Sequence, residues 1–289
     1  LWQALGASQG DFERIIVAPK NALDAFNTVA EIFNLVEHYQ CPGLVLSDLL
    51  ISEGTFSIDP DAINLHPQID RGELITEPAL GDDGLADPGT RQGSGYLRYK
   101  NTPSGVSPRA VPGLEGYVHV VPSDEHDEDS VLISDEFTNP LKRRMMVEKR
   151  ARKMAGTLDL ILAPALEGPE DADVTLIGFG STYGVIQEAA EQLRDQGVSA
   201  NHLQIKWIVP LHGEVISKVI SSAKRTIMVE NNHSGQFYRY LRGETGLSVD
   251  GHIRKYDGEP FMPHHVVSCV REQLAGETTH SVPYQEIMV

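Results

Sequence analysis

The hydrophobic pattern is clearest from residue 174 to the end of the chain, where short apolar runs alternate with amphipathic stretches. The apolar runs have the length of buried strands and lie at 174–177, 203–209, 226–230 and 253–256. Apolar residues at helical spacing follow them and predict helices around 185–193, 214–220, 237–242 and 263–274. Strands that alternate with helices predict an α/β fold, with a small doubly wound parallel sheet for residues 174–289.

Residues 1–55 show this alternation only once. An apolar strand at 15–17 is followed by a helix capped by Asn21 and by a second buried strand at 43–48. The apolar positions of this helix recur at helical spacing and are Leu23, Phe26, Ala30, Phe33 and Val36. Two strands and one helix cannot cover both faces of a sheet, so this unit is expected to be the end of a larger domain. The rest of that domain would lie before Leu1 or in a tightly bound second fragment.

Residues 56–173 are rich in Gly, Pro and Asp and predict an extended linker of short strands and turns that packs on neighbouring subunits. The exception is a basic helix at 139–155, in which Pro140 suits the first turn. The preceding segment, 123–136, carries seven acidic residues against the seven basic residues of the helix. The two segments are interpreted as electrostatic complements within or between subunits, and two separately solvated faces are the alternative.

Composition narrows the function classes. The 289 residues are 40% hydrophobic and carry a net charge of −17, which fits a globular protein and argues against a nucleic-acid partner. Because there is neither a long apolar run nor a secretory leader, no membrane span and a cytoplasmic location are expected. The only two cysteines, Cys41 and Cys269, are too few for an iron–sulfur or zinc site, so any redox cluster is expected on another chain.

The turn GFGSTYG at 178–184 lies between a predicted strand and a predicted helix, where backbone N–H groups can bind a phosphate. Its spacing is G-x-G-x-x-x-G, and the next strand ends in Val209 and Pro210 instead of an acidic residue. Both features argue against a nicotinamide cofactor. A turn at a subunit interface, or an anion pocket lined by Ser181 and Thr182, is expected instead.

Two further segments are candidate sites. The run VENNHSGQF places four polar residues at the carboxyl end of a parallel strand, where such sheets usually bind ligands. They are Glu230, Asn231, Asn232 and Gln236. The loop at 96–113 brings Arg98, Lys100 and Arg109 together for a carboxylate or a phosphate. The alternatives are turn and capping roles for the first segment and a solvated loop for the second.

The acidic run at 125–128 is not expected to bind a metal, because contiguous residues of an extended chain point in alternating directions. The spacing of residues also indicates no nucleophile with a supporting base.

Three stretches of the sequence together resemble one family, the α subunits of 2-oxoacid:ferredoxin oxidoreductases. Residues 10–48 resemble the end of that subunit's pyrimidine-binding domain. The motif YLRYKNTPSGVSPRAVPG with the following EHDED and MVEKRARKM is similar to the linker of the 2-oxoglutarate branch. VTLIGFGSTYG and VENNHSGQ are similar to the transketolase-like C-terminal domain.

The resemblance implies oxidative decarboxylation of a 2-oxoacid with coenzyme A, or the reverse reaction, with ferredoxin as the electron carrier. It implies that thiamine diphosphate, Mg²⁺ and a [4Fe–4S] cluster belong mainly to a partner β subunit. It also places the catalytic residues upstream of Leu1, in the missing half of the α subunit, so that this chain is not catalytic alone. A heterotetramer is expected. Pyruvate or a branched-chain 2-oxoacid as substrate, and a non-catalytic assembly module, are the alternatives.

For individual residues, the expected roles fall into two groups. Substrate or coenzyme A is expected to contact Arg98, Tyr99, Ser107 and Arg109. A subunit interface or anion pocket is expected to include Ser181, Thr182, Glu230, Asn231, Asn232 and Gln236.

Overall fold

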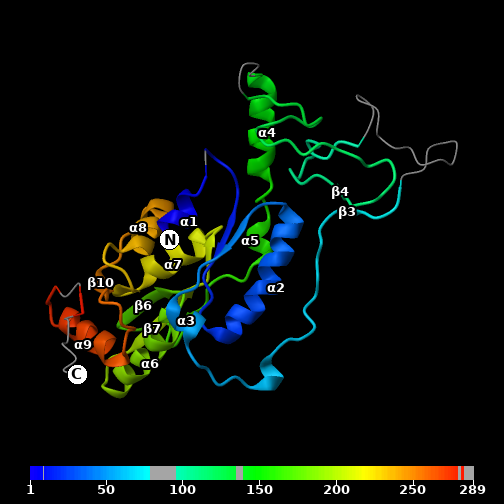
Figure 1. The fold of residues 1–289 in the computed structure, drawn as a ribbon. Helices are drawn as coiled ribbons and strands as arrows, with labels where there is room; N and C mark the ends of the chain where they lie inside the picture. Colours follow the sequence, from blue (N-terminus) through cyan, green and yellow to red (C-terminus); the bar gives the residue numbers. More distant parts are fainter. Residues whose placement is uncertain (9, 79–95, 135–138, 279–280, 283–289) are drawn as a thin grey trace.

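A five-stranded sheet forms the C-terminal half of the molecule (Figure 1). The computed structural model describes residues 1–8, 10–78, 96–134, 139–278 and 281–282. The strand order is β10-β9-β6-β7-β5. The strands are β6 (Val174–Phe179), β7 (Ala200–Ile205), β9 (Thr226–Glu230), β10 (Gly251–Arg254) and β5 (Leu166–Glu167). All pair in parallel except β5, which runs antiparallel to β7. The predicted parallel sheet is confirmed.

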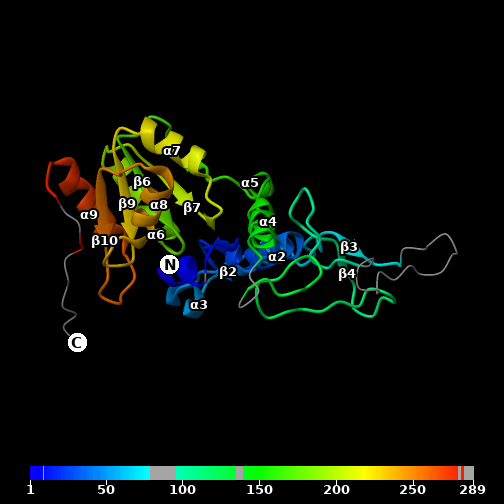
Figure 2. The same cartoon turned by 90° about the horizontal axis from the view of Figure 1, so that it is seen from above.

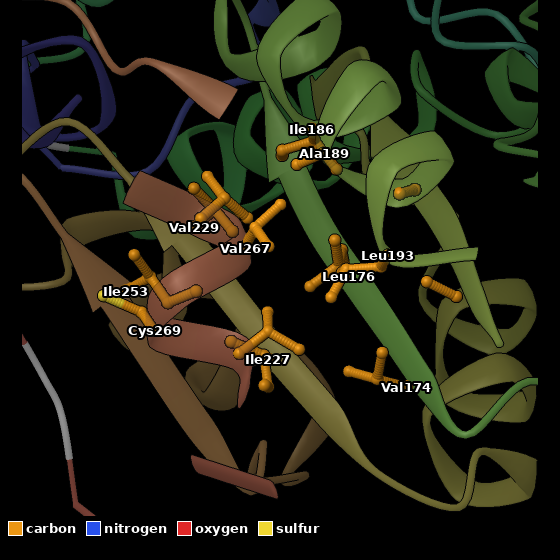
Figure 3. Close-up of a cluster of buried hydrophobic side chains, with 14 of the residues drawn as sticks. Val174, Leu176, Ile186, Ala189, Leu193, Ile227, Val229, Ile253, Val267 and Cys269 are labelled. Atoms are coloured by element: carbon orange, nitrogen blue, oxygen red, sulfur yellow. The ribbon is translucent and has the colours of Figure 1, made fainter. Parts of the chain in front are cut away.

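Helices cover both faces of this sheet. α6 (Thr182–Asp195) and α9 (Pro263–Leu274) pack on one face, and α7 (Gly213–Ser222) and α8 (Gln236–Thr245) pack on the other. Figure 3 shows the first layer, in which Leu176 and Ile227 of the sheet meet Leu193 of α6 and Val267 of α9. The expected apolar stripe of α6 is confirmed, since Ile186, Ala189, Ala190 and Leu193 are buried. β5 belongs to this sheet although it precedes the domain boundary expected at 173/174, and the expected boundaries stay predictions.

The strand predicted at 203–209 is wrong in one respect, because it divides at Lys206. β8 (Trp207–Val209) leaves the five-stranded sheet and pairs antiparallel with β1 (Ile15–Val17). β1 also pairs in parallel with β2 (Gly43–Val45), which gives a second sheet with the order β2-β1-β8. The chain therefore crosses from one sheet to the other at a single residue.

Lys206 is held from three sides at this crossing. Its ammonium Nζ lies 2.7 Å from an Asp24 oxygen and 2.6 Å from a Glu31 oxygen, and both acids belong to α2 (Ala22–Tyr39). Its backbone carbonyl accepts a 2.9 Å hydrogen bond from the N–H of Ala18, just after β1. These contacts turn the chain toward the N-terminal unit, and the apolar pattern alone could not reveal them.

The N-terminal βαβ unit is confirmed, with β1 fully buried and Asn21 Oδ1 accepting a 2.8 Å hydrogen bond from the N–H of Asp24 at the start of α2. The helix is preceded by α1 (Trp2–Gly6), whose last carbonyls, those of Ala4 and Leu5, accept hydrogen bonds from Arg14. The second strand is shorter than predicted and is not buried, because the chain ends β2 at Val45 and begins α3 (Leu49–Glu53) with Asp48 as its cap.

The apolar positions expected on α2 are only partly buried. The helix buries Thr28, Ile32, Leu35 and Tyr39, whereas Phe26 and Phe33 are 49% and 62% exposed. Apolar residues occur on two faces of this helix, and helical spacing cannot decide which of them meets the sheet. The unit therefore presents an exposed apolar helix face beside β2, which is an edge strand among the described residues.

The middle of the chain extends away from the two sheets as short elements around one longer helix (Figure 2). These are η1 (Pro60–Ala62), β3 (Leu74–Ile75), β4 (Arg109–Ala110), α4 (Pro140–Arg152) and α5 (Thr157–Leu160). The predicted basic helix is confirmed as α4, with Asn139 as its cap and Pro140 in its first turn.

The acidic and basic segments do complement each other within this chain. Glu125 forms ion pairs with Arg143 at 2.9 Å and with Arg150 at 2.6 Å, and Asp127 pairs with Lys142. Burial by itself would raise the pKa of Asp127, but hydrogen bonds from Lys142 and from backbone N–H groups outweigh burial and lower this pKa. The alternative, in which the two segments are separately solvated and do not pair, is therefore ruled out.

Glu230 determines where α8 begins. Its carboxylate is fully buried and accepts hydrogen bonds from the backbone N–H groups of Phe237 at 2.8 Å and Tyr238 at 3.1 Å. It also accepts one from the Asn232 side chain at 2.9 Å. A carboxylate at a helix N-terminus satisfies N–H groups that have no partner within the helix and interacts favourably with the helix dipole.

We expect Lys206→Met to lower the free energy of unfolding by about 1 kcal/mol, because it removes two partly exposed ion pairs that join the sheets. The measurement is urea unfolding of the purified protein. Lys218→Met, at an exposed position of α7, is the matched control and should change stability by less than about 0.5 kcal/mol. Equal stability of the two variants would contradict the role given to Lys206.

A second substitution tests the cap of α8. Glu230→Gln keeps the shape of the side chain but places an amide N–H₂ opposite a backbone N–H, so the free energy of unfolding should fall by about 2–4 kcal/mol. Glu244→Gln makes the same change at an exposed position of α8 and should be nearly neutral. Thermal and urea unfolding of both variants give the comparison, and a neutral Glu230→Gln would refute the capping role.

Candidate functional site

A cavity of about 700 Å³ lies at the carboxyl ends of β6, β9 and β10, against α3 of the N-terminal unit. Parallel sheets usually bind ligands at this edge, where the helices that follow the strands begin. Five of the predicted residues line it together: Ser181, Thr182, Asn231, Asn232 and Gln236. The sequence prediction that these two distant segments share one site is compatible with this arrangement, and their binding role stays a prediction.

The glycines of the GFGSTYG turn serve packing and chain direction. A side chain at Gly178 would collide with Ile186 and would lie 2.7 Å from Thr182 Oγ1, so glycine allows α6 to approach β6. Gly180 has a φ of +59°, which lets the chain turn into the helix. Thr182 Oγ1 then donates a 2.9 Å hydrogen bond to the carbonyl of Phe179.

The protein places its own carboxylates near the helix N-termini at this edge. Asp48 accepts a hydrogen bond from Ser181 Oγ at the start of α6, while Glu230 occupies the start of α8. Asp48 also accepts a 3.2 Å hydrogen bond from the N–H of Ile51, so it connects α3 to the C-terminal sheet. An external anion at Ser181 would therefore have to compete with Asp48.

Lys255 is the cation of this cavity. It is only 5% exposed, and its ammonium binds Asp257 and donates a 3.1 Å hydrogen bond to the carbonyl of Glu259. The hydrogen bond from Lys255 is the main reason why the pKa of Asp257 is lowered. The lining includes no histidine, so Ser181 and Asp48 lack the base that a nucleophilic triad requires. Amide groups and paired charges suit binding and positioning.

A second cavity of about 540 Å³ adjoins the first and shares Ser181, Thr182 and Asn231 with it. Its other walls include Phe56, Pro260, Phe261 and Met262, so it is the more apolar of the two. Ser181 and Thr182 thus lie at the border between a polar and an apolar chamber.

The candidate residues from the middle of the chain differ in whether they already have partners within the protein. Arg109 pairs with Glu37 of α2 and donates a 3.2 Å hydrogen bond to the carbonyl of Arg71. The hydrogen bonds that Glu37 accepts from the side chains of Arg109 and Arg71 lower its pKa. Ser107 is buried, and its Oγ donates a 2.8 Å hydrogen bond to the carbonyl of Lys100. Both side chains therefore have structural partners already.

Arg98 and Tyr99 are more available. The guanidinium carbon of Arg98 lies 5.3 Å from the centre of the Tyr99 ring, whose other neighbour is His126 at 4.1 Å. In the described part of the chain no carboxylate forms an ion pair with Arg98. None of Arg98, Tyr99, Ser107 and Arg109 lines the cavity at the sheet edge, so the predicted residues form two separate groups. Their proposed contacts with substrate or coenzyme A stay predictions.

Sequence reasoning missed Asp48 and Lys255. The dipeptide Ser47-Asp48 before an apolar run is a helix N-cap signal, and it could have identified the start of α3. Lys255 gave no comparable signal, because its burial depends on Asp257 and Glu259 folding back over it.

The described residues bring together no group of three or more His, Cys, Asp or Glu side chains suited to a metal ion. Cys41 lies at the end of α2 and Cys269 in α9, and burial raises the pKa of each thiol to about 11. These two cysteines do not fit an iron–sulfur cluster, which needs about four thiolates in one place. The described helices also include none that is both long and apolar enough to cross a membrane.

Known proteins of similar sequence show which family this chain resembles. Residues 165–236 match the family model of the C-terminal domain of transketolase. The chain is 31% identical over 95% of its length to subunit alpha of 2-oxoacid:ferredoxin oxidoreductase 2 from Aeropyrum pernix, and it covers 40% of that subunit. It is 26% identical over 93% of its length to the 2-oxoglutarate synthase subunit KorA from Methanothermobacter marburgensis, and it covers 66% of that relative.

Among solved structures, the fold matches the 2-oxoglutarate:ferredoxin oxidoreductase from Magnetococcus marinus, which has 2-oxoglutarate, coenzyme A and succinyl-CoA bound. The TM-score is 0.76 at 27% identity, and the match covers 95% of this chain and 44% of that one. The chain thus spans less than half of that protein and of the Aeropyrum subunit. It is similar to the α subunits of 2-oxoacid:ferredoxin oxidoreductases, and its residues 165–236 are similar to the C-terminal domain of transketolase.

Proposed function

We propose that this chain is part of the α subunit of a 2-oxoglutarate:ferredoxin oxidoreductase. The observation that carries the proposal is the agreement of the fold, over 95% of the chain, with an enzyme that binds 2-oxoglutarate, coenzyme A and succinyl-CoA. Relatives named 2-oxoglutarate synthase and 2-oxoglutarate oxidoreductase support the same substrate. The reaction is oxidative decarboxylation of 2-oxoglutarate with coenzyme A to succinyl-CoA and CO₂, with two electrons passing to ferredoxin, or its reverse.

The proposal assigns the chemistry to the assembled protein. Thiamine diphosphate would supply the carbanion chemistry, and the cofactor, its Mg²⁺ and the [4Fe–4S] cluster would be held mainly by a β subunit. The scarcity of cysteines and the absence of a metal-ligand group among the described residues support this division. The exposed apolar face of α2 and the edge strand β2 support contact with the rest of the pyrimidine-binding domain.

In this proposal the carboxyl edge of the C-terminal sheet faces a neighbouring subunit. The cavity there is lined by amides and by charges that are already paired, which suits a binding surface better than a reacting centre. Arg98 and Arg109, with Tyr99 and Ser107 beside them, would contact an anionic group of 2-oxoglutarate or coenzyme A.

The function is tested by purifying the full-length protein with its natural partner chains and measuring viologen reduction. We expect coenzyme A-dependent reduction with 2-oxoglutarate that exceeds the rate with pyruvate and with branched-chain 2-oxoacids. A preference for pyruvate or a branched-chain acid would reject the 2-oxoglutarate assignment. That alternative has its own support, because the two relatives from Aeropyrum pernix carry only the broader name 2-oxoacid:ferredoxin oxidoreductase. No reduction with any 2-oxoacid would reject the proposal as a whole.

Arg98→Met tests the role of the loop. Loss of one charge-assisted hydrogen bond should raise the KM for 2-oxoglutarate or coenzyme A at least about fivefold, with kcat changed by less than about twofold. Arg144→Met is the control, because Arg144 is an exposed arginine of α4 that pairs only with Glu148. Unchanged KM values for both substrates would remove Arg98 from the site.

Arg109→Ala should also raise one of these KM values several-fold, and Glu37→Gln separates a direct role from a structural one. Glu37→Gln removes the carboxylate that binds Arg109 but leaves the guanidinium in place. If Arg109 contacts substrate, only Arg109→Ala raises KM, as measured by steady-state kinetics. Equal effects of the two variants would show that Arg109 acts only by holding β4 against α2.

A further inference from the structure

α4 buries a lysine in a place where cations outnumber acids. Lys149 is 4% exposed, although lysine is almost never buried without a partner. Within the described residues it forms no ion pair with a carboxylate. The charged groups around it are Arg98, Arg150, Lys153 and Glu128.

The acids that could balance these cations already have other partners. Glu125 forms ion pairs with both Arg143 and Arg150, and Glu128 accepts a 2.5 Å hydrogen bond from the backbone N–H of Asn101. Burial and the neighbouring cations Lys153, Arg98 and Arg150 lower the pKa of Lys149 to about 8. Burial also lowers the pKa of Lys153, and Arg98 and Arg150 add to this effect. The cluster therefore has an excess of positive charge that a bound anion would relieve.

Several contacts fix the backbone that carries Lys149 and Lys153. Gly105, with a φ of +80°, brings the 102–106 turn so close to α4 that a side chain there would collide with the Lys149 carbonyl. Arg152 donates hydrogen bonds to the Asn101 side chain and to the Thr102 carbonyl, so it ties the same loop to the helix. Lys153 Nζ donates a 2.8 Å hydrogen bond to the carbonyl of Gln40, at the end of α2. Groups arranged before binding lose little freedom when a ligand arrives.

We propose that Lys149, Lys153 and Arg98 form a binding site for the phosphate group of a small molecule, where α4, the 97–107 loop and the end of α2 meet. A phosphate monoester carries close to two negative charges and three acceptor oxygens, which matches three neighbouring cations better than a single carboxylate does. The inference rests on the proposed function in one respect, because coenzyme A, with its 3′-phosphate, would be the natural source. Inorganic phosphate is the other source of the same chemistry.

The proposal is tested by calorimetric titration and thermal unfolding of the full-length protein in its complex, in chloride buffers of matched ionic strength. The ligands are coenzyme A, dephospho-coenzyme A and inorganic phosphate. Lys149→Met should weaken binding of coenzyme A at least about tenfold and leave dephospho-coenzyme A, which lacks the 3′-phosphate, nearly unchanged. Lys149→Arg keeps the charge and should retain most of the affinity. Lys218→Met, at an exposed position of α7, is the control and should bind like the wild type.

The stability of Lys149→Met distinguishes a ligand-binding lysine from a lysine that only stabilises the fold. Without any phosphate ligand, Lys149→Met should be at least as stable as the wild type, because it removes an uncompensated buried charge. Phosphate or coenzyme A should raise the melting temperature of the wild type and not that of Lys149→Met. Equal ligand affinity of the two proteins, or a lower melting temperature of Lys149→Met in plain chloride, would overturn the site. If inorganic phosphate binds and coenzyme A does not, the site stands and its source is free phosphate.

The two proposals fail in different ways. Titration needs no turnover, so intact phosphate binding in a protein that reduces no acceptor would reject the proposed function alone. An active enzyme in which Lys149→Met binds every ligand normally would reject the phosphate site alone.

Discussion

The change of sheet at Lys206 fixes how the two halves of the molecule lie. Ile205 is the last residue of one sheet and Trp207 is the first of the other, so one peptide segment belongs to two cores. The ion pairs of Lys206 with Asp24 and Glu31 and the hydrogen bond from Ala18 hold this crossing against α2. The cavity at the sheet edge follows from the crossing, because its walls come from both halves.

Carboxylates of the protein itself organise that edge. Glu230 satisfies the N-terminal N–H groups of α8, and Asp48 caps α3 and accepts a hydrogen bond from Ser181. A helix N-terminus attracts negative charge, and here the attraction serves to start a helix and to join two structural units. The amides Asn231, Asn232 and Gln236 remain beside these charges as groups that a partner or ligand could meet.

Charge also organises the middle of the chain, where hydrophobic contacts are sparse. The acidic segment folds back on α4 through Glu125 and Asp127, and β4 is joined to α2 by the pair of Arg109 with Glu37. These pairs occupy Glu125 and Asp127, whereas Lys149, Lys153 and Arg98 form no ion pair among the described residues. The same pairing that folds the segment therefore creates the cationic cluster.

The sequence by itself determined the parallel sheet, the cap of α2, the basic helix with Pro140 in its first turn, the complementarity of the acidic and basic segments, and the meeting of the 181–182 and 231–236 segments at one sheet edge. All of these follow from local spacing, capping chemistry or the rule that parallel strands end on one side. Only the tertiary structure decided that the run at 203–209 divides between two sheets, that Phe26 and Phe33 face outward, and that Lys149 and Lys255 are buried. The physical reason is that burial and charge pairing depend on segments far apart in the chain. Asp24 and Lys206 are 182 residues apart in the sequence, and Asp48 and Ser181 are 133 residues apart.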